Sequence, residues 1–193
     1  LGFIWAKAYG IHYTPDGDEN TYFYMAKLMA GGKLFYRDFF FAHPPLQLIL
    51  LSLIYVCFGF NFILLKASAF LPVLVGTAFI YHRFWKKGEK LSAFLFALLF
   101  LFNYELLKIT THPFGLNLTA CFLLISLYYF LEDRPRLCGI HGGLAAMTGL
   151  YALPWAAIPF GYYLIFSSRG RKNGFERGPR NYFFDLLYFL TGF

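Results

Sequence analysis

Charged residues are scarce in this chain: they make up 14% of its 193 residues, whereas a soluble domain carries about 25%. This shortage excludes an ordinary soluble enzyme and a disordered, charge-rich segment. Apolar residues take the place of charge, with 59% hydrophobic and 23% aromatic residues and a mean hydropathy of +0.53. Such a composition is typical of a protein that crosses a membrane several times.

Cysteine is also rare, with three residues, Cys57, Cys121 and Cys138, all in apolar surroundings. The sequence contains no CxxC pair and no Cys/His pair at ligand spacing, which argues against a zinc or redox site. Because a free thiol behaves as a small hydrophobic group, we expect buried free cysteines, with an interhelical disulfide as the alternative. Internal repeats and low-complexity segments are absent as well.

The excess of positive charge is +7, with a pI near 9.3, and its placement excludes nucleic acid as the partner. Three short loops, His82–Lys90, Glu132–Arg136 and Ser167–Asn181, carry net charges of +3, 0 and +4. They account for the whole excess, so the rest of the chain is neutral. Basic residues confined to short loops between apolar stretches indicate membrane topology.

The uncharged stretches are long enough to predict membrane-spanning helices, which need about 20 apolar residues. We predict spans over about 67–84, 91–107, 112–131, 137–152 and 153–168. Residues 1–11 and 182–193 resemble parts of further spans. We therefore expect the whole chain, 1–193, to be the N-terminal part of a longer membrane domain.

This number of crossings puts the three charged loops on one side of the bilayer, with 11 of the 17 basic residues. That side is then the cytoplasm, and the polar loop 12–66 lies outside. Residues 46–60 follow Pro44-Pro45 and end in the run Gly59-Phe60-Asn61. They offer about 24 Å of helix, which is marginal for a crossing. We expect them to form a helix at the outer interface.

The expected fold is therefore all-α: a polytopic transmembrane helical bundle whose first external loop contains interfacial helices. Small residues at Gly139, Gly143 and Ala146 predict a close contact between two helices. Lys66, between the interfacial helix and the next span, is expected to reach the lipid headgroups. Asn117 begins a glycosylation sequon inside an apolar span, where we expect it to remain unused.

The external loop contains three acids within four positions, Asp16, Asp18 and Glu19. Helix capping is one interpretation, since Asp16 as N-cap and Glu19 three residues later form a capping box. An apolar stripe over residues 22–29 and the pair Gly31-Gly32 would complete that helix. Capping alone does not explain three acids where one would serve.

Two other interpretations assign chemistry to the acids. Asp16, Asp18 and Asn20 match the first three ligand positions of a calcium loop, but Thr21 stands where that loop needs Gly and Lys27 where it needs Glu. Alternatively, a carboxylate at the start of a helix beside a membrane can accept a proton from an attacking hydroxyl group. The residues alone leave capping and proton transfer open.

Four short elements then follow one another in order. They are Asp18-Glu19-x-x-Tyr22, Met25-Ala26-Lys27-Leu28-Met29, Gly32-Lys33-x-x-Tyr36-Arg37-Asp38-Phe39 and His43-Pro44-Pro45-Leu46. This arrangement resembles the first external loop of the GT-C membrane glycosyltransferases, in particular protein O-mannosyltransferases and lipid A aminoarabinose transferases. The resemblance covers about residues 15–46 in its motifs, and the order of loops and spans fits nearly the whole chain.

The resemblance implies transfer of a sugar from a polyprenyl-phosphate donor to a glycan, lipid or protein acceptor at the extracytoplasmic face. Asp18 would be the catalytic base and Glu19 its partner, and both would be the metal ligands if a divalent cation takes part. The substrate-binding residues would be Tyr22, Lys33, Arg37, Asp38 and His43. Arg37 is favoured for the phosphate because its guanidinium forms a bidentate fork.

Two positions depart from the pattern of these families. Ala42-His43 stands where aminoarabinose transferases have an acid before the Pro-Pro pair, and His112-Pro113 stands where many relatives have an acid at the external end of a later span. Both departures bear on metal dependence and on the acceptor. The alternative functions are a membrane transporter, which would place ionisable residues in mid-span, and a non-catalytic membrane scaffold.

Overall fold

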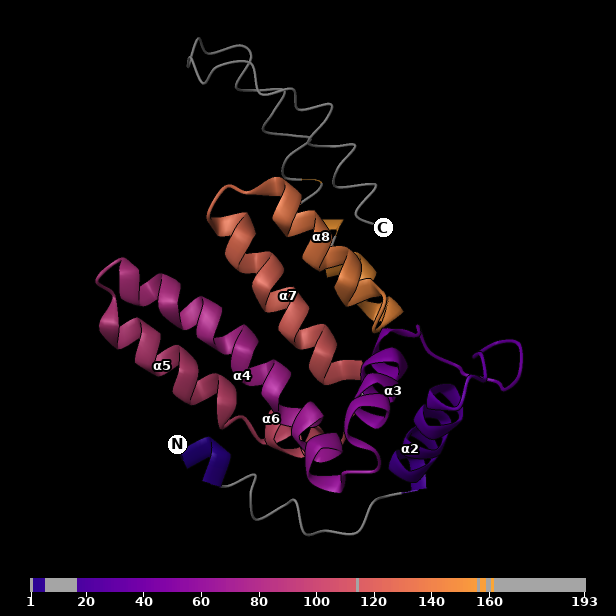
Figure 1. Cartoon of the computed structure of the whole chain (residues 1–193). Helices are drawn as coiled ribbons and strands as arrows, with labels where there is room; N and C mark the ends of the chain where they lie inside the picture. The colour runs from indigo at the N-terminus through magenta and orange to yellow at the C-terminus, as the bar shows by residue number, and fades with distance from the viewer. Residues whose placement is uncertain (1, 6–16, 114, 156, 159–160, 162–193) are drawn as a thin grey trace.

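The computed structural model describes residues 2–5, 17–113, 115–155, 157–158 and 161 (Figure 1). The described residues are mostly helical and contain no β-strand, so the predicted all-α class is confirmed. The helices are α2 (Gly17–Ala30), α3 (Leu46–Phe58), α4 (Phe62–Lys86), α5 (Lys90–Leu101), α6 (Tyr104–Ile109), α7 (Gly115–Leu131) and α8 (Pro135–Ala146), followed by the 3-10 turn η1 (Leu150–Ala152).

The long helices form a bundle in which α4 and α7 run parallel, while α5 and α8 run in the opposite direction (Figure 1). At one end, Lys66 Nζ lies 3.3 Å from the carbonyl oxygen of Thr111. At the other end, Arg83 donates to the carbonyl oxygen of Leu131 at 3.0 Å. The two backbones come close at Gly76, where an added Cβ would lie 3.0 Å from the Cα of Cys121.

The two described basic loops share one end of this bundle, as the charge pattern predicts. Arg83 Nε lies 3.2 Å from a carboxylate oxygen of Glu132, which joins the last turn of α4 to the loop after α7. We call this the basic end. The opposite end, where α4 and α7 begin and α8 finishes, we call the site end. The third predicted loop, Ser167–Asn181, lies outside the described residues.

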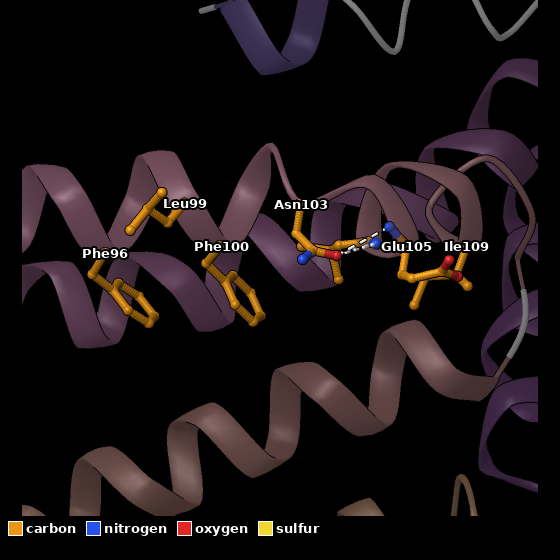
Figure 2. A pocket seen from close by; sticks show the side chains of 7 residues that line it. Phe96, Leu99, Phe100, Asn103, Glu105 and Ile109 are labelled. Carbon is orange, nitrogen blue, oxygen red and sulfur yellow. Dashed lines mark hydrogen bonds between the residues drawn. The ribbon is translucent and has the colours of Figure 1, made fainter.

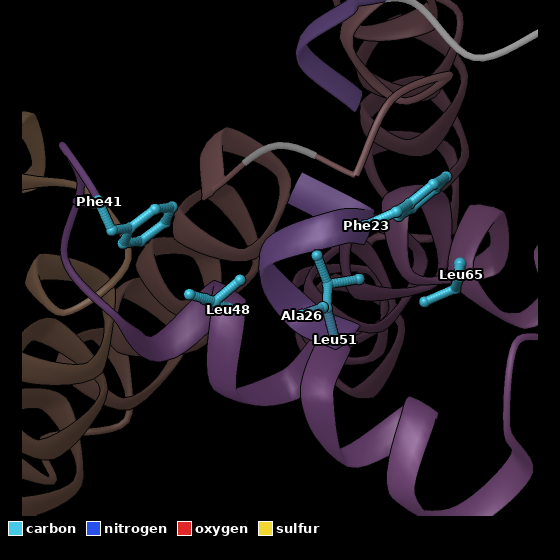
Figure 3. Close-up of a cluster of buried hydrophobic side chains, with 6 residues drawn as sticks. All are labelled: Phe23, Ala26, Phe41, Leu48, Leu51 and Leu65. Carbon is cyan, nitrogen blue, oxygen red and sulfur yellow. The ribbon is translucent and has the colours of Figure 1, made fainter. Parts of the chain in front are cut away.

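Helices α2 and α3 pack together on the site end around a small apolar core (Figure 3). Its buried members are Phe23, Ala26, Phe41, Leu48, Leu51 and Leu65. Helix α3 starts where Leu46 N donates to the carbonyl oxygen of Met147, just after α8, and stops shortly before α4 begins. Both of its ends therefore lie at the site end, and this 13-residue helix does not run the length of the bundle.

Helix α4 begins at Phe62, five residues before the predicted start of its span at 67, so that Lys66 lies inside the helix. Two other predicted spans are interrupted. The stretch 91–107 is divided into α5 and α6, because the side chain of Asn103 accepts hydrogen bonds from Glu105 N and Leu106 N and starts a new helix. The stretch 137–152 is also divided, into α8 and η1. Most of the predicted span 153–168 lies outside the described residues.

One helix within the described ranges, α4, is both long and apolar enough to cross a membrane by length and composition. Helix α8 buries Gly139, Gly143 and Ala146 against its neighbours, which confirms the predicted close contact. Cys121 and Cys138 are buried free thiols, as expected, but Cys57 is exposed because it lies near the end of α3.

Candidate functional site

The two acids at the start of α2 point to different sides of the helix. Asp18 is exposed, whereas Glu19 is completely buried. Successive residues of an α-helix are separated by about 100° of rotation, so neighbours cannot share one face. The buried residues of α2 are Glu19, Phe23 and Ala26, which follow the helical spacing of four and three residues. Glu19 therefore continues the apolar face by which α2 packs onto the bundle.

Lys66, in the first turns of α4, neutralises Glu19 inside the protein. Its Nζ lies 2.7 Å from Oε1 and 2.8 Å from Oε2 of Glu19, and the two side chains are 3% and 0% exposed. The expectation that Lys66 reaches the lipid headgroups is therefore wrong. A buried lysine needs a counter-ion because the cost of removing its charge from water is large, and Glu19 supplies that counter-ion.

His112 completes this group, which we call the inner cluster: Glu19, Lys66 and His112. Its Nδ1 lies 3.4 Å from Oε2 of Glu19, and the imidazole is 28% exposed at the rim. Asn117 holds the backbone in place by donating to the carbonyl oxygens of Ile109 at 3.2 Å and His112 at 2.7 Å. His112 thus lies beside Glu19.

The loop that carries His112 is also tied to α3. The side-chain amide of Gln47, in the first turn of α3, donates to the carbonyl oxygen of Pro113. Both Gln47 and Asn117 are buried, so the amide of the predicted sequon is used inside the protein. The hydrogen bonds of Gln47 and Asn117 join α3 and α7 to the loop between α6 and α7, which carries His112.

Tyr22 lies one helical turn after Asp18 and connects it with His43. The pKa of Tyr22 is raised, first by burial and then by the negative charge of Asp18. Its ring contacts Phe41 edge to face, with centroids 6.1 Å apart, and lies 6.2 Å from the His43 ring. The structure therefore brings together three of the residues assigned from the sequence, namely Asp18, Tyr22 and His43.

Lys33, Arg37 and Asp38 form a second group, which we call the outer cluster. Arg37 donates to both carboxylate oxygens of Asp38, at 3.0 and 2.9 Å, and Leu34 N donates to Oδ2 at 2.8 Å. The Arg37 hydrogen bond, the Leu34 hydrogen bond and the nearby charge of Lys33 lower the pKa of Asp38 to about 2. Asp38 is thus occupied in shaping its own loop, while the Arg37 side chain remains 67% exposed.

The outer cluster is linked to the rest of the site through Tyr36. This residue has a positive φ of 63°, and its hydroxyl group donates to the carbonyl oxygen of His43 at 2.5 Å. Positive φ is strained for a bulky residue. The hydrogen bond offsets this strain and connects the two ends of the segment from Tyr36 to His43.

The metal interpretation finds little support in this geometry. Asp18 and Glu19 face different sides, and the ammonium group of Lys66 already occupies the inner face of Glu19. Across the described residues, no group of three or more His, Cys, Asp or Glu side chains could hold a metal ion. Asp16, which the capping and calcium interpretations both require, lies outside those residues.

A separate pocket of about 530 Å³ lies along α5 and α6 (Figure 2). Its wall is mostly apolar, with Asn103 and Glu105 as its polar members, and none of the inner or outer cluster residues lines it. The oxygen of Asn103 is already used to start α6. The residues that line the pocket are Phe96, Leu99, Phe100, Asn103, Glu105, Leu106 and Ile109.

Sequence reasoning missed the partner of Glu19, although a signal was present. Lys66 is the single charged residue between the uncharged stretches Phe39–Leu65 and Ala67–His82. An isolated charge within so much apolar sequence usually has a specific partner.

Comparisons of the chain with protein-family models, curated proteins and solved structures find no match.

Proposed function

We propose that the chain is part of a polytopic membrane protein, with α4, α5–α6, α7 and α8 as spans and the site end outside the cytoplasm. The length of α4 and the basic residues gathered at the opposite end support this placement. Large apolar side chains are exposed along the helices, for example Leu91 and Leu99 at 70% each. Exposed apolar faces of this kind suit a lipid environment.

We further propose that this protein is a GT-C type glycosyltransferase that uses a polyprenyl-phosphate-linked sugar as donor. The observation that carries the proposal is that the two acids at the start of α2 have different environments. Glu19 is buried and neutralised by Lys66, while Asp18 is exposed at the site end next to Tyr22. An exposed carboxylate on a rigid helix can accept the proton of an acceptor group as that group attacks the sugar.

In this mechanism, Asp18 removes the proton of the acceptor hydroxyl or amide while the acceptor atom attacks the anomeric carbon. The bond from that carbon to the phosphate oxygen breaks, its electron pair leaves with the polyprenyl phosphate, and the configuration is inverted. Negative charge on the departing phosphate requires cations. Arg37 is the first choice because its guanidinium is exposed and forms bidentate contacts, and Lys33 and His43 are close to it in the chain.

The rival functions differ in where they need charge. A transporter needs ionisable side chains along the middle of its spans. In the described helices from α4 to α8, the Asp, Glu, Lys and Arg residues lie near helix ends, as Lys66 and Arg83 illustrate. His141 is the ionisable side chain in the middle of α8, and its Nδ1 lies 2.7 Å from the carbonyl oxygen of Leu137 in the same helix. A non-catalytic scaffold would need Glu19 and Lys66 for folding but would not need Asp18.

Replacement of Asp18 separates a glycosyltransferase from a scaffold. We expect Asp18→Asn to lower sugar transfer by about 10²–10⁴-fold, the usual contribution of a general base, with an unchanged melting temperature. The assay follows radiolabelled hexose or pentose from polyprenyl phosphate to endogenous acceptors, using full-length protein in native membranes. Asn20→Ala, an exposed change two residues away, is the matched control. Equal transfer by Asp18→Asn and the control would overturn the assignment of the base.

A further inference from the structure

We infer that Lys66 is a positioning residue of this site: it holds Glu19 inside the bundle and thereby sets the face of α2 that presents Asp18. The inference rests on the proposed function for its catalytic meaning. Lys66 Nζ lies within 3.3 Å of three oxygens, two from Glu19 and one from Thr111. The ammonium group donates hydrogen bonds to Oε2 of Glu19 and to the carbonyl oxygen of Thr111, while its contact with Oε1 is an ion pair without a hydrogen bond. Lys66 therefore joins α2, α4 and the loop before α7 at one point.

The rotation of α2 about its own axis depends on this contact. Glu19, Phe23 and Ala26 form its buried face, whereas Asp18 lies about 100° away around the helix. Phe23 and Ala26 are members of the apolar core, and the hydrophobic effect that buries them is non-directional. The Glu19–Lys66 pair is directional, and it adds a strong penalty to any rotation that would carry Glu19 away from its ammonium partner.

The partner side of the contact is held firmly in place. Lys66 belongs to the 25-residue helix α4, and the loop at Thr111 and His112 is held by the hydrogen bonds of Asn117. The Nδ1 atom of His112 lies 3.4 Å from Oε2 of Glu19 and adds a second contact to this carboxylate. The rotation of α2 is therefore set by its contact with α4 and with the loop at Thr111 and His112. This rotation in turn sets the direction in which Asp18 points.

If Lys66 loses its charge, Glu19 becomes a buried carboxylate without its ammonium counter-ion. Breaking a buried pair on one side is strongly destabilising, whereas replacing both partners with uncharged residues of similar size is often nearly neutral. We therefore expect Lys66→Met to release α2 so that Glu19 can reach water. The double variant Glu19→Gln/Lys66→Met leaves no buried charge at this contact, so α2 should pack on the bundle as it does in the parent protein.

The position of α2 can be measured without any knowledge of the substrate, by labelling a cysteine introduced at Ala26, which is 0% exposed. The experiment uses full-length protein in lipid nanodiscs with Cys57→Ser, because Cys57 is the exposed native thiol. A maleimide that does not cross membranes reports the labelling rate. A cysteine at the exposed position Asn20 reports the full rate of an accessible thiol.

We expect Lys66→Met to raise the labelling rate of Ala26→Cys by at least about tenfold, since it breaks a buried pair. Lys27→Met, which removes an exposed lysine from α2 itself, should leave the rate unchanged. The Glu19→Gln/Lys66→Met background should return it to within about twofold of the parent. Equal rates in the parent and in Lys66→Met, or a double variant as reactive as Lys66→Met, would overturn the inference.

Sugar transfer provides the second measurement. A positioning residue lowers kcat and leaves KM for the lipid-linked sugar unchanged, because Lys66 does not contact the donor in the proposed mechanism. We expect this pattern in Lys66→Met. A changed KM with an unchanged kcat would contradict the role. If the parent protein transfers no sugar, the proposed function fails, and the labelling rates still decide whether Lys66 sets the place of α2.

Discussion

The inner and outer clusters contain the same chemical groups, an acid next to a basic side chain, in opposite environments. Glu19 and Lys66 are 0% and 3% exposed and lie 47 residues apart in the chain. Arg37 and Asp38 are adjacent in sequence, with side chains 67% and 24% exposed. Desolvation makes the first pair a strong geometric constraint, whereas water screens the second pair and leaves Arg37 able to bind an anion.

The comparison shows that neighbouring acids in a motif can have different tasks. Asp18 and Glu19 both carry a carboxylate group, yet of the two only Glu19 is on the face of α2 that packs on the bundle. Asp38 is an acid as well, but its two oxygens are occupied by Arg37 and Leu34. Among these three, Asp18 remains the acid best placed to act on a substrate.

The largest difference between the clusters should appear in stability. We expect Lys66→Met to destabilise the protein by about 3–5 kcal/mol, because it removes the counter-ion of Glu19 from a buried pair. Arg37→Met removes an exposed partner and should leave the melting temperature unchanged. Thermal unfolding of full-length protein in detergent micelles, followed by tryptophan fluorescence, measures both. Equal melting temperatures for the two variants would show that burial does not distinguish the clusters.

A smaller loss of stability is expected from the frame behind the inner cluster. Asn117→Ala removes the amide that binds the carbonyl oxygens of Ile109 and His112. Leaving partly buried carbonyl groups without this partner costs up to about 1–3 kcal/mol, the penalty for a fully buried group. The same unfolding measurement tests this value, with Asn20→Ala as the exposed control. A loss as small as that of the control would mean that the loop before α7 does not depend on Asn117.

The smallest effect concerns protonation in the outer cluster. Asp38 has a pKa of about 2, below its ordinary value of 3.8. Because the folded pKa is lowered, the stabilisation from ionised Asp38 is fully present above the ordinary value and is lost as the pH falls through about 2. Arg37→Met should raise the pKa of Asp38 toward 3.8, since the Arg37 hydrogen bond is the largest cause of the shift.

The titration can be followed by NMR of labelled aspartate carboxyl carbons, with Asp38→Asn to identify the signal. Glu19→Gln is the matched control from the inner cluster and should leave the Asp38 titration unchanged. A pKa of Asp38 that stays at about 2 in Arg37→Met would show that Leu34 and Lys33, and not Arg37, hold the carboxylate ionised.

Much of the architecture follows from local sequence. The turn at Gly31-Gly32 ends α2 as predicted, and Gly32 has the positive φ of 88° that glycine adopts readily. The short helix after Pro44-Pro45 is confirmed, as is the shared end of the loops that follow α4 and α7. The break between α5 and α6 was missed, because Asn103 lies in an apolar stretch and acts through its side chain.

Composition and charge pattern by themselves determined the helical class, the common end of the described basic loops and the stretch in which the acids lie. These are consequences of hydrophobic periodicity and short-range charge, which operate over a few helical turns. Tertiary structure decided that Glu19 pairs with Lys66, that His112 joins them and that Asp18 faces outward. Such choices depend on which distant groups are buried together, because a charge removed from water must find its partner wherever the packing places it.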